Sequence, residues 1–211
     1  MPARLRPTAP TAADAILVGD PGRALMLAQA LLEQPKMSNH ARGLWGYSGV
    51  TPDGRQLTIQ ATGMGGPSAS VVLTDLAELG VRRAIRIGTC ASLGDLEVGR
   101  LLVVAEARTA AGGSAHPDRE LTGALARALP DAHLGVAVSL DSLHDPERER
   151  PSVLAEAADM QTAALLGAAA ELEVAVAAVL IVSERSDAGQ LPDEELEEAA
   201  KRAGRSAAGL F

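Results

Sequence analysis

Two short glycine-rich segments have the composition of anion-binding loops. Residues 19–23 read GDPGR and follow an apolar run, and residues 62–68 read TGMGGPS between a predicted strand and a predicted helix. Glycine lets the backbone approach an anion closely, and the N–H groups at the start of a helix point towards it. Both segments also fit ordinary connections, a type I turn in the first case and a tight strand-to-helix turn in the second.

Arg86 is the charged residue with the clearest chemical implication. It stands inside residues 84–88 (AIRIG), which read as an apolar strand, and Thr89 follows directly. A buried guanidinium is costly unless an anion or a carboxylate pairs with it. Ligands of α/β proteins bind at the carboxyl ends of strands, where Thr89 would lie. Arg86 therefore indicates either an anion site or an internal ion pair with Asp20 or Asp75.

Two further polar segments follow predicted strands. Residues 159–161 (DMQ) precede a predicted helix, so Asp159 fits the role of a helix cap as well as that of a site residue. Residues 183–187 (SERSD) come directly after the long apolar run at 174–183. Their charges belong either to a site at the end of a central strand or to a solvated loop.

Strand and helix patterns alternate along the chain and predict one α/β domain. The predicted strands cover residues 15–19, 44–50, 56–62, 84–88, 100–107, 134–140 and 174–183. The predicted helices cover residues 23–33, 67–79, 117–129, 163–172 and a last segment from about residue 193. We expect a mixed central β-sheet flanked by helices over residues 14–211, after an irregular segment at 1–13.

Composition excludes several classes of protein. The 211 residues carry a net charge of −8, which disfavours a nucleic-acid polymer as partner. The single cysteine, Cys90, allows no internal disulfide. No secretory leader or apolar run of membrane-spanning length is visible, so we expect a cytoplasmic protein without a membrane partner. No His, Cys and carboxylate cluster has the spacing of metal ligands, so no metal is expected.

Taken together, four segments resemble the nucleoside phosphorylase family that includes uridine phosphorylase and the hexameric purine nucleoside phosphorylases. They are GDPGR, residues 62–70 (TGMGGPSAS), residues 86–104 (RIGTCASLGDLEVGRLLVV) and DMQ, in order over about residues 14–190. The resemblance implies phosphate-dependent cleavage of the N-glycosidic bond of a ribo- or deoxyribonucleoside. The products are the free base and (deoxy)ribose 1-phosphate, with inorganic phosphate as co-substrate and no other cofactor.

The resemblance also implies a role for individual residues. Phosphate contacts fall on Gly19, Arg23, Arg86 and Thr89, together with Arg42 from a neighbouring subunit, so a homo-oligomer built from dimers, and by resemblance a hexamer, is expected. Ribose contacts fall on Met160 and Gln161. The base lies near Cys90, Ala91, Leu143, Arg148, Glu184 and Arg185. Arg86 and Glu184 are the expected catalytic residues.

Several positions depart from the family pattern and leave the base open. Gln161 stands where the family has a glutamate, and no histidine precedes His40. Leu143 replaces a base-stacking aromatic residue, and residues 145–152 are shorter than the flap of uridine phosphorylases. Overall similarity favours uridine phosphorylase.

Glu184 favours a purine nucleoside, because it stands where the purine enzymes have an aspartate. A protonated Glu184 could donate its proton to the imidazole nitrogen of a purine. Arg185 or Arg148 could instead donate hydrogen bonds to the carbonyl oxygens of a pyrimidine. Two alternatives to a phosphorylase stay open, a nucleosidase on the same fold and a non-catalytic member that binds nucleosides.

Overall fold

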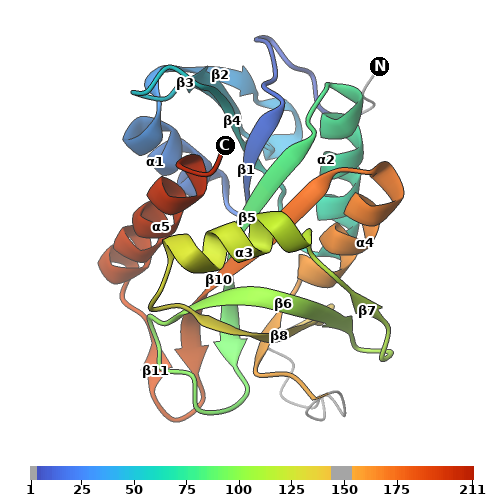
Figure 1. Ribbon diagram of the computed structural model, residues 1–211, viewed down its shortest axis with the longest axis vertical. Coiled ribbons are helices and arrows are strands. Elements are labelled where there is room, and N and C mark those ends of the chain that lie inside the picture. The colour runs from blue at the N-terminus through green and yellow to red at the C-terminus, as the bar shows by residue number, and fades with distance from the viewer. Residues whose placement is uncertain (1–3, 144–153) are drawn as a thin grey trace.

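Helices and strands alternate along the chain in the computed structural model, which describes residues 4–143 and 154–211 (Figure 1). The strands are β1 (Asp14–Val18), β2 (Glu33–Asn39), β3 (Gly46–Val50), β4 (Gln56–Ala61), β5 (Arg83–Ser92), β6 (Leu101–Thr109), β7 (Ser114–Ala115), β8 (His133–Ser139), β9 (Ala157–Asp159), β10 (Ala175–Arg185) and β11 (Gly189–Gln190). The helices are α1 (Pro21–Leu31), the short 3-10 helix η1 (Ala41–Gly43), α2 (Gly66–Glu78), α3 (Arg119–Ala128), α4 (Thr162–Leu172) and α5 (Asp193–Ala208).

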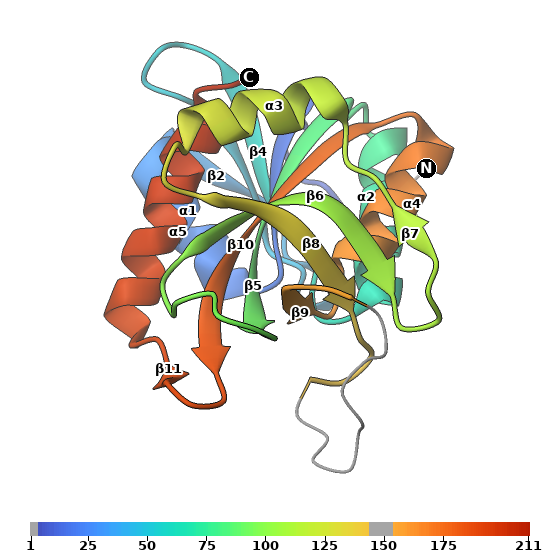
Figure 2. The same ribbon diagram turned by 60° about the horizontal axis from the view of Figure 1, so that its bottom comes forward.

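The strands form one mixed sheet, as predicted. Its order is β11-β10-β6-β8-β9-β5-β1-β4-β3-β2, with β7 paired to β6. Strands β4, β1, β5 and β10 are mutually parallel neighbours, and β5 also pairs with β9. Because β10, β6, β8 and β9 connect the two sides of β5, part of the sheet closes into a ring, which Figure 2 shows from its open end. The carboxyl ends of β1, β4, β5 and β10 therefore meet at one edge.

Two apolar cores cover the two faces of the sheet. Helices α1, α3 and α5 pack on one face, and α2 and α4 pack on the other (Figure 1). Side chains of a strand alternate between faces, so Ile85 and Ile87 of β5 enter the first core. Arg86 lies between them in sequence and consequently faces the side of the sheet covered by α2 and α4.

Strands β2, β7, β9 and β11 fall outside the predicted strand ranges, and β2 and β9 are the longest of them. Strand β2 reads EQPKMSN, contains a proline and lies at the edge of the sheet, where a missing N–H group is tolerated. Strand β9 is only three residues long and is held between β5 and β8. Neither has the apolar alternation of a typical strand, so only the pairing with their neighbours reveals them.

The segment before β1 is tied to the domain although residues 4–13 form no helix or strand. Leu5 is buried, and the backbone N–H groups of Arg4 and Leu5 both donate to Asp75 Oδ2 at 2.7 Å. This contact accounts for the buried carboxylate of Asp75 on α2. Among the described residues, no helix is both long enough and apolar enough to cross a membrane.

Candidate active site

The two glycine-rich segments lie side by side at the carboxyl ends of β1 and β4. The Thr62 N–H group donates to the Val18 carbonyl at 2.7 Å, and a Cβ atom on Gly19 would lie 3.5 Å from the Gly63 carbonyl oxygen. Gly63 and Gly65 have φ angles of 72° and 79°, which side chains with a Cβ atom rarely adopt. The second loop therefore needs glycine for its conformation, beside the segment that contains Arg23.

Arg86 is buried on β5 and makes three hydrogen bonds to the start of α4. Its Nε donates to Thr162 Oγ1 at 3.1 Å, and its terminal nitrogens donate to Gln161 Oε1 at 2.6 Å and to Asp159 Oδ2 at 3.1 Å. The ion pair with Asp159 is nearly closed to solvent. These bonds use three of the five N–H groups of the guanidinium within the described part of the chain.

The carboxylate partner of Arg86 differs from the two considered from sequence. Asp20 instead caps α1, accepting from the Arg23 N–H group at 2.7 Å, and Asp75 holds the segment before β1. Asp159 combines two roles, because it also caps α4 by accepting from the Thr162 N–H group at 3.0 Å. It further accepts from Ser139 Oγ at 2.5 Å. The buried carboxylate is therefore stabilised by hydrogen bonds as well as by its ion pair with Arg86.

Arg23 lies within electrostatic reach of Arg86. Burial lowers the pKa of the Arg23 guanidinium, the charge of Asp20 opposes this shift, and the positive charge of Arg86 adds to the lowering. Arg23 follows β1, and Arg86 lies on the neighbouring parallel strand β5. An anion at this edge of the sheet could accept from the N–H groups that remain on Arg86.

The thiol of Cys90, near the end of β5, is buried and is not available as a reactive group. Cys90 is buried and donates through its Sγ to the Ile181 carbonyl at 3.6 Å. Burial raises the pKa of the Cys90 thiol, as does the negative charge of Asp159, so the thiol stays protonated. Thr89 and Ala91, on either side of it, are partly exposed. A base beside this strand would therefore meet the backbone of Cys90 rather than its side chain.

Glu184 lies beside Ala91 at the end of the sheet. The two residues are paired across β10 and β5, at a bulge in the ladder, and Glu184 is half-buried. Gln190 Nε2 lies 3.4 Å from Glu184 Oε2. Arg185 is bound locally, since its Nε donates to Asp187 Oδ1 at 2.5 Å. Glu184 is thus the acidic side chain at the carboxyl end of the central strand β10.

The structure describes three of the remaining predicted site residues, Met160, Leu143 and Arg42. Met160 is partly buried and borders a cavity of about 260 Å³, and Leu143 is partly buried at the end of the first described segment. Arg42 is exposed in η1 with a φ angle of 59°. Arg148 lies outside the described residues.

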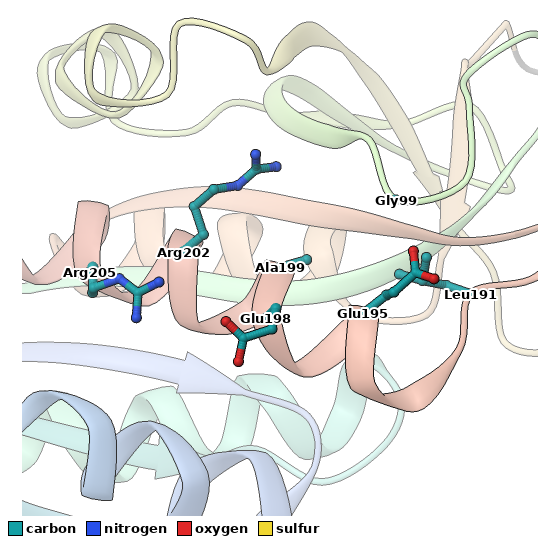
Figure 3. A pocket seen from close by; sticks show the side chains of 7 residues that line it. All are labelled: Gly99, Leu191, Glu195, Glu198, Ala199, Arg202 and Arg205. Carbon is teal, nitrogen blue, oxygen red and sulfur yellow. The ribbon is translucent and has the colours of Figure 1, made fainter.

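Further cavities lie among the described residues. Arg23 borders a cavity of about 320 Å³ between the first turns of α1 and α5. A separate cavity of about 390 Å³ lies along α5 near Gly99, where Arg202 and Glu198 line it (Figure 3). Among the described residues, no group of three or more His, Cys, Asp and Glu side chains could hold a metal ion.

The sequence profile of the phosphorylase superfamily matches residues 14–211. The chain belongs to this superfamily. It is 45% identical over 83 residues to the DeoD-type purine nucleoside phosphorylase of Oceanobacillus iheyensis, a match that spans 38% of this chain and only 35% of that relative. It is 32% identical over 195 residues to the DeoD-type purine nucleoside phosphorylase of Latilactobacillus sakei, with 83% of each chain covered.

The fold is also that of a solved phosphorylase. The crystal structure of purine nucleoside phosphorylase from Toxoplasma gondii in complex with immucillin-H superposes with a TM-score of 0.84, covering 95% of this chain and 92% of that one. Sequence identity in this superposition is 20%, so the likeness concerns the fold alone.

Thr162 and Ser139 take part in the arginine site although the sequence did not indicate them, and Thr62 of the second glycine-rich segment joins them. Thr162 and Ser139 both bind Asp159, and the Thr62 hydroxyl lies 3.1 Å from Gln161 Oε1. A single serine or threonine belongs to no recognisable sequence motif, so its role cannot be predicted from its position in the sequence. Thr162 alone could have been suspected, because it stands three residues after the capping Asp159.

Proposed function

We propose that this phosphorylase superfamily member is a purine nucleoside phosphorylase. It would use inorganic phosphate to cleave the N-glycosidic bond of a purine ribo- or deoxyribonucleoside, releasing the base and (deoxy)ribose 1-phosphate. The observation that carries the proposal is that buried Arg86 lies on β5 while the segment containing Gly19 and the glycine loop follow its parallel neighbours β1 and β4, at the carboxyl ends of the strands. The names of the curated relatives support the same activity.

Phosphate is the proposed nucleophile. Gly19, Arg23, Arg86 and Thr89 would hold it below C1′ of the sugar, where Met160 would contact the ribose. Cleavage passes through an oxocarbenium-like state, which a nearby phosphate both stabilises and captures. Charge-assisted bonds from the guanidinium groups fix the phosphate in position, and positioning supplies much of the rate.

The leaving base is the second chemical problem, because it gathers negative charge as the bond breaks. Glu184 at the end of β10 would donate a proton to the imidazole ring of a purine. The ion pair between Arg185 and Asp187 makes Arg185 less available to a pyrimidine carbonyl oxygen. We therefore favour purine nucleosides over uridine, although overall sequence similarity had favoured uridine phosphorylase.

The same proposal covers the cofactor requirement, the cellular location and the assembly of the enzyme. Phosphate would be a co-substrate, with no further cofactor, and the enzyme would work in the cytoplasm as a homo-oligomer. Arg42, which the family resemblance assigns to a neighbour's phosphate site, is exposed and so accessible to a second subunit.

A substrate assay tests the activity. We expect inosine to be cleaved in the presence of phosphate, with ribose 1-phosphate as product, and uridine to be cleaved far more slowly. Base release should be measured by absorbance with and without phosphate. Equal rates in both conditions would indicate a nucleosidase, and a bound but unconverted nucleoside would indicate a non-catalytic member.

The Arg42→Ala substitution tests assembly. If Arg42 completes the phosphate site of a neighbour, the KM for phosphate should rise about tenfold, the usual value of one charge-assisted contact. Arg127→Ala, at an exposed position on α3, is the matched control. Light scattering should show at least a dimer, and a fully active monomer would contradict the shared site.

A further inference from the structure

The side-chain amide of Gln161 is buried where three segments of the arginine site meet. Its Oε1 accepts from the guanidinium of Arg86 at 2.6 Å and lies 3.1 Å from the hydroxyl of Thr62. Its Nε2 donates to the carbonyl of Gly63 at 2.5 Å and to that of Gly65 at 3.3 Å. The side chain is only 3% exposed.

The chemistry of the neighbours decides which end of the amide faces which partner. Arg86 can only donate, so the atom beside it must be the oxygen, and the two glycine carbonyls can only accept, so the atom beside them must be the NH₂ group. Both amide protons are thereby used within the protein, and the oxygen is directed at Arg86 and Thr62. A glutamate at this position could satisfy Arg86 but would place an oxygen against the Gly63 carbonyl oxygen.

We infer that Gln161 is a positioning residue for the phosphate site and does not bind the sugar. It connects Arg86 on β5 to the glycine loop after β4, and its oxygen lies 3.8 Å from where a Cβ atom of Gly19 would be. The inference rests on the proposed phosphorylase function, and it replaces the ribose contact that family resemblance implied for Gln161. Met160 then remains the sugar-facing residue of this segment.

The charge of the side chain gives the inference its distinctive consequence. Arg86 and Asp159 carry opposite charges, and the neutral amide of Gln161 adds no negative charge beside them. A carboxylate at position 161 would add a negative charge beside the proposed anion site and place an oxygen against the carbonyl oxygens of Gly63 and Gly65. We therefore expect Gln161→Glu to raise the KM for phosphate by about tenfold or more, since a mispaired buried polar group carries a large penalty.

Steady-state kinetics of the full-length protein test this, with phosphate varied against inosine and against 2′-deoxyinosine. The positioning role requires a higher KM for phosphate in Gln161→Glu, with the KM for inosine and the preference between the two nucleosides unchanged. Gln29→Glu makes the same charge change at an exposed position on α1 and should alter neither constant. A lower KM for inosine, or a shifted preference between ribo- and deoxyribonucleoside, would instead show that residue 161 binds the sugar and would overturn the inference.

A second variant and a binding measurement cover the other outcomes. Gln161→Met keeps the volume without the amide, and it too should raise the KM for phosphate. If it lowers only the melting temperature, Gln161 is merely structural and the inference is wrong. If the unaltered protein cleaves no nucleoside, the proposed function fails separately. In that case, stabilisation against heat by inorganic phosphate should be present in the unaltered protein and lost in Gln161→Glu, and equal stabilisation of both would refute the inference.

Discussion

Replacing Arg86 with methionine is expected to lower kcat/KM for inosine phosphorolysis about a hundred- to a thousandfold, as loss of one preorganised donor to a developing charge does. Arg86 is the buried guanidinium at the proposed phosphate site. Initial rates at varied phosphate concentration measure the effect. Nearly unchanged turnover would remove Arg86 from the catalytic machinery and leave it as a structural ion pair.

The same substitution should also destabilise the fold, and this effect must be separated from catalysis. Asp159 would be left buried without its counter-charge, which costs about 3–5 kcal/mol in comparable pairs. The double variant Arg86→Met with Asp159→Asn removes the orphaned charge while an amide oxygen can still cap α4. We expect urea unfolding to show stability partly restored in the double variant, with no recovery of phosphorolysis.

Replacing Glu184 with glutamine is expected to lower kcat for inosine about a hundredfold, the usual contribution of a general acid. The amide keeps the size of the side chain and its place beside Gln190, but it cannot deliver a proton to the leaving purine. Any residual cleavage of uridine should change little, because its leaving group would not use Glu184. The ratio of the two kcat values is the quantity to measure.

Glu194→Gln is the control for this experiment, because Glu194 is exposed in the first turn of α5 and carries the same charge. It should leave both nucleosides unaffected. If Glu184→Gln also leaves inosine turnover unchanged, Glu184 is a partly solvent-exposed residue near the end of β10 and does not act as a proton donor. The choice of base would then have to come from other residues near the pocket.

Regular elements with a strong apolar pattern were predicted well from sequence. The long apolar run at 174–183 is β10, and the last helix starts at Asp193 with three acidic residues in its first turn, as the helix dipole favours. Short or polar strands escaped prediction because their residues show no alternation. Strand β9 matters most among them, since its last residue is Asp159.

The sequence by itself determined the chemical character of the site. An arginine inside an apolar strand must meet a negative partner, and glycines at 63 and 65 permit a loop that other residues would strain. These are local properties of residue type, so they can be read without coordinates.

The tertiary structure alone decided which partners these residues have. Arg86 meets a carboxylate 73 positions away in sequence, and the amide of Gln161 joins a loop 98 positions away. Both contacts exist because β9 pairs with β5 and brings the start of α4 to the end of the sheet. Local patterns encode which faces are apolar, but they do not encode the order of strands in a sheet. For that reason the identity of the counter-ion and the role of Gln161 became visible only in the fold.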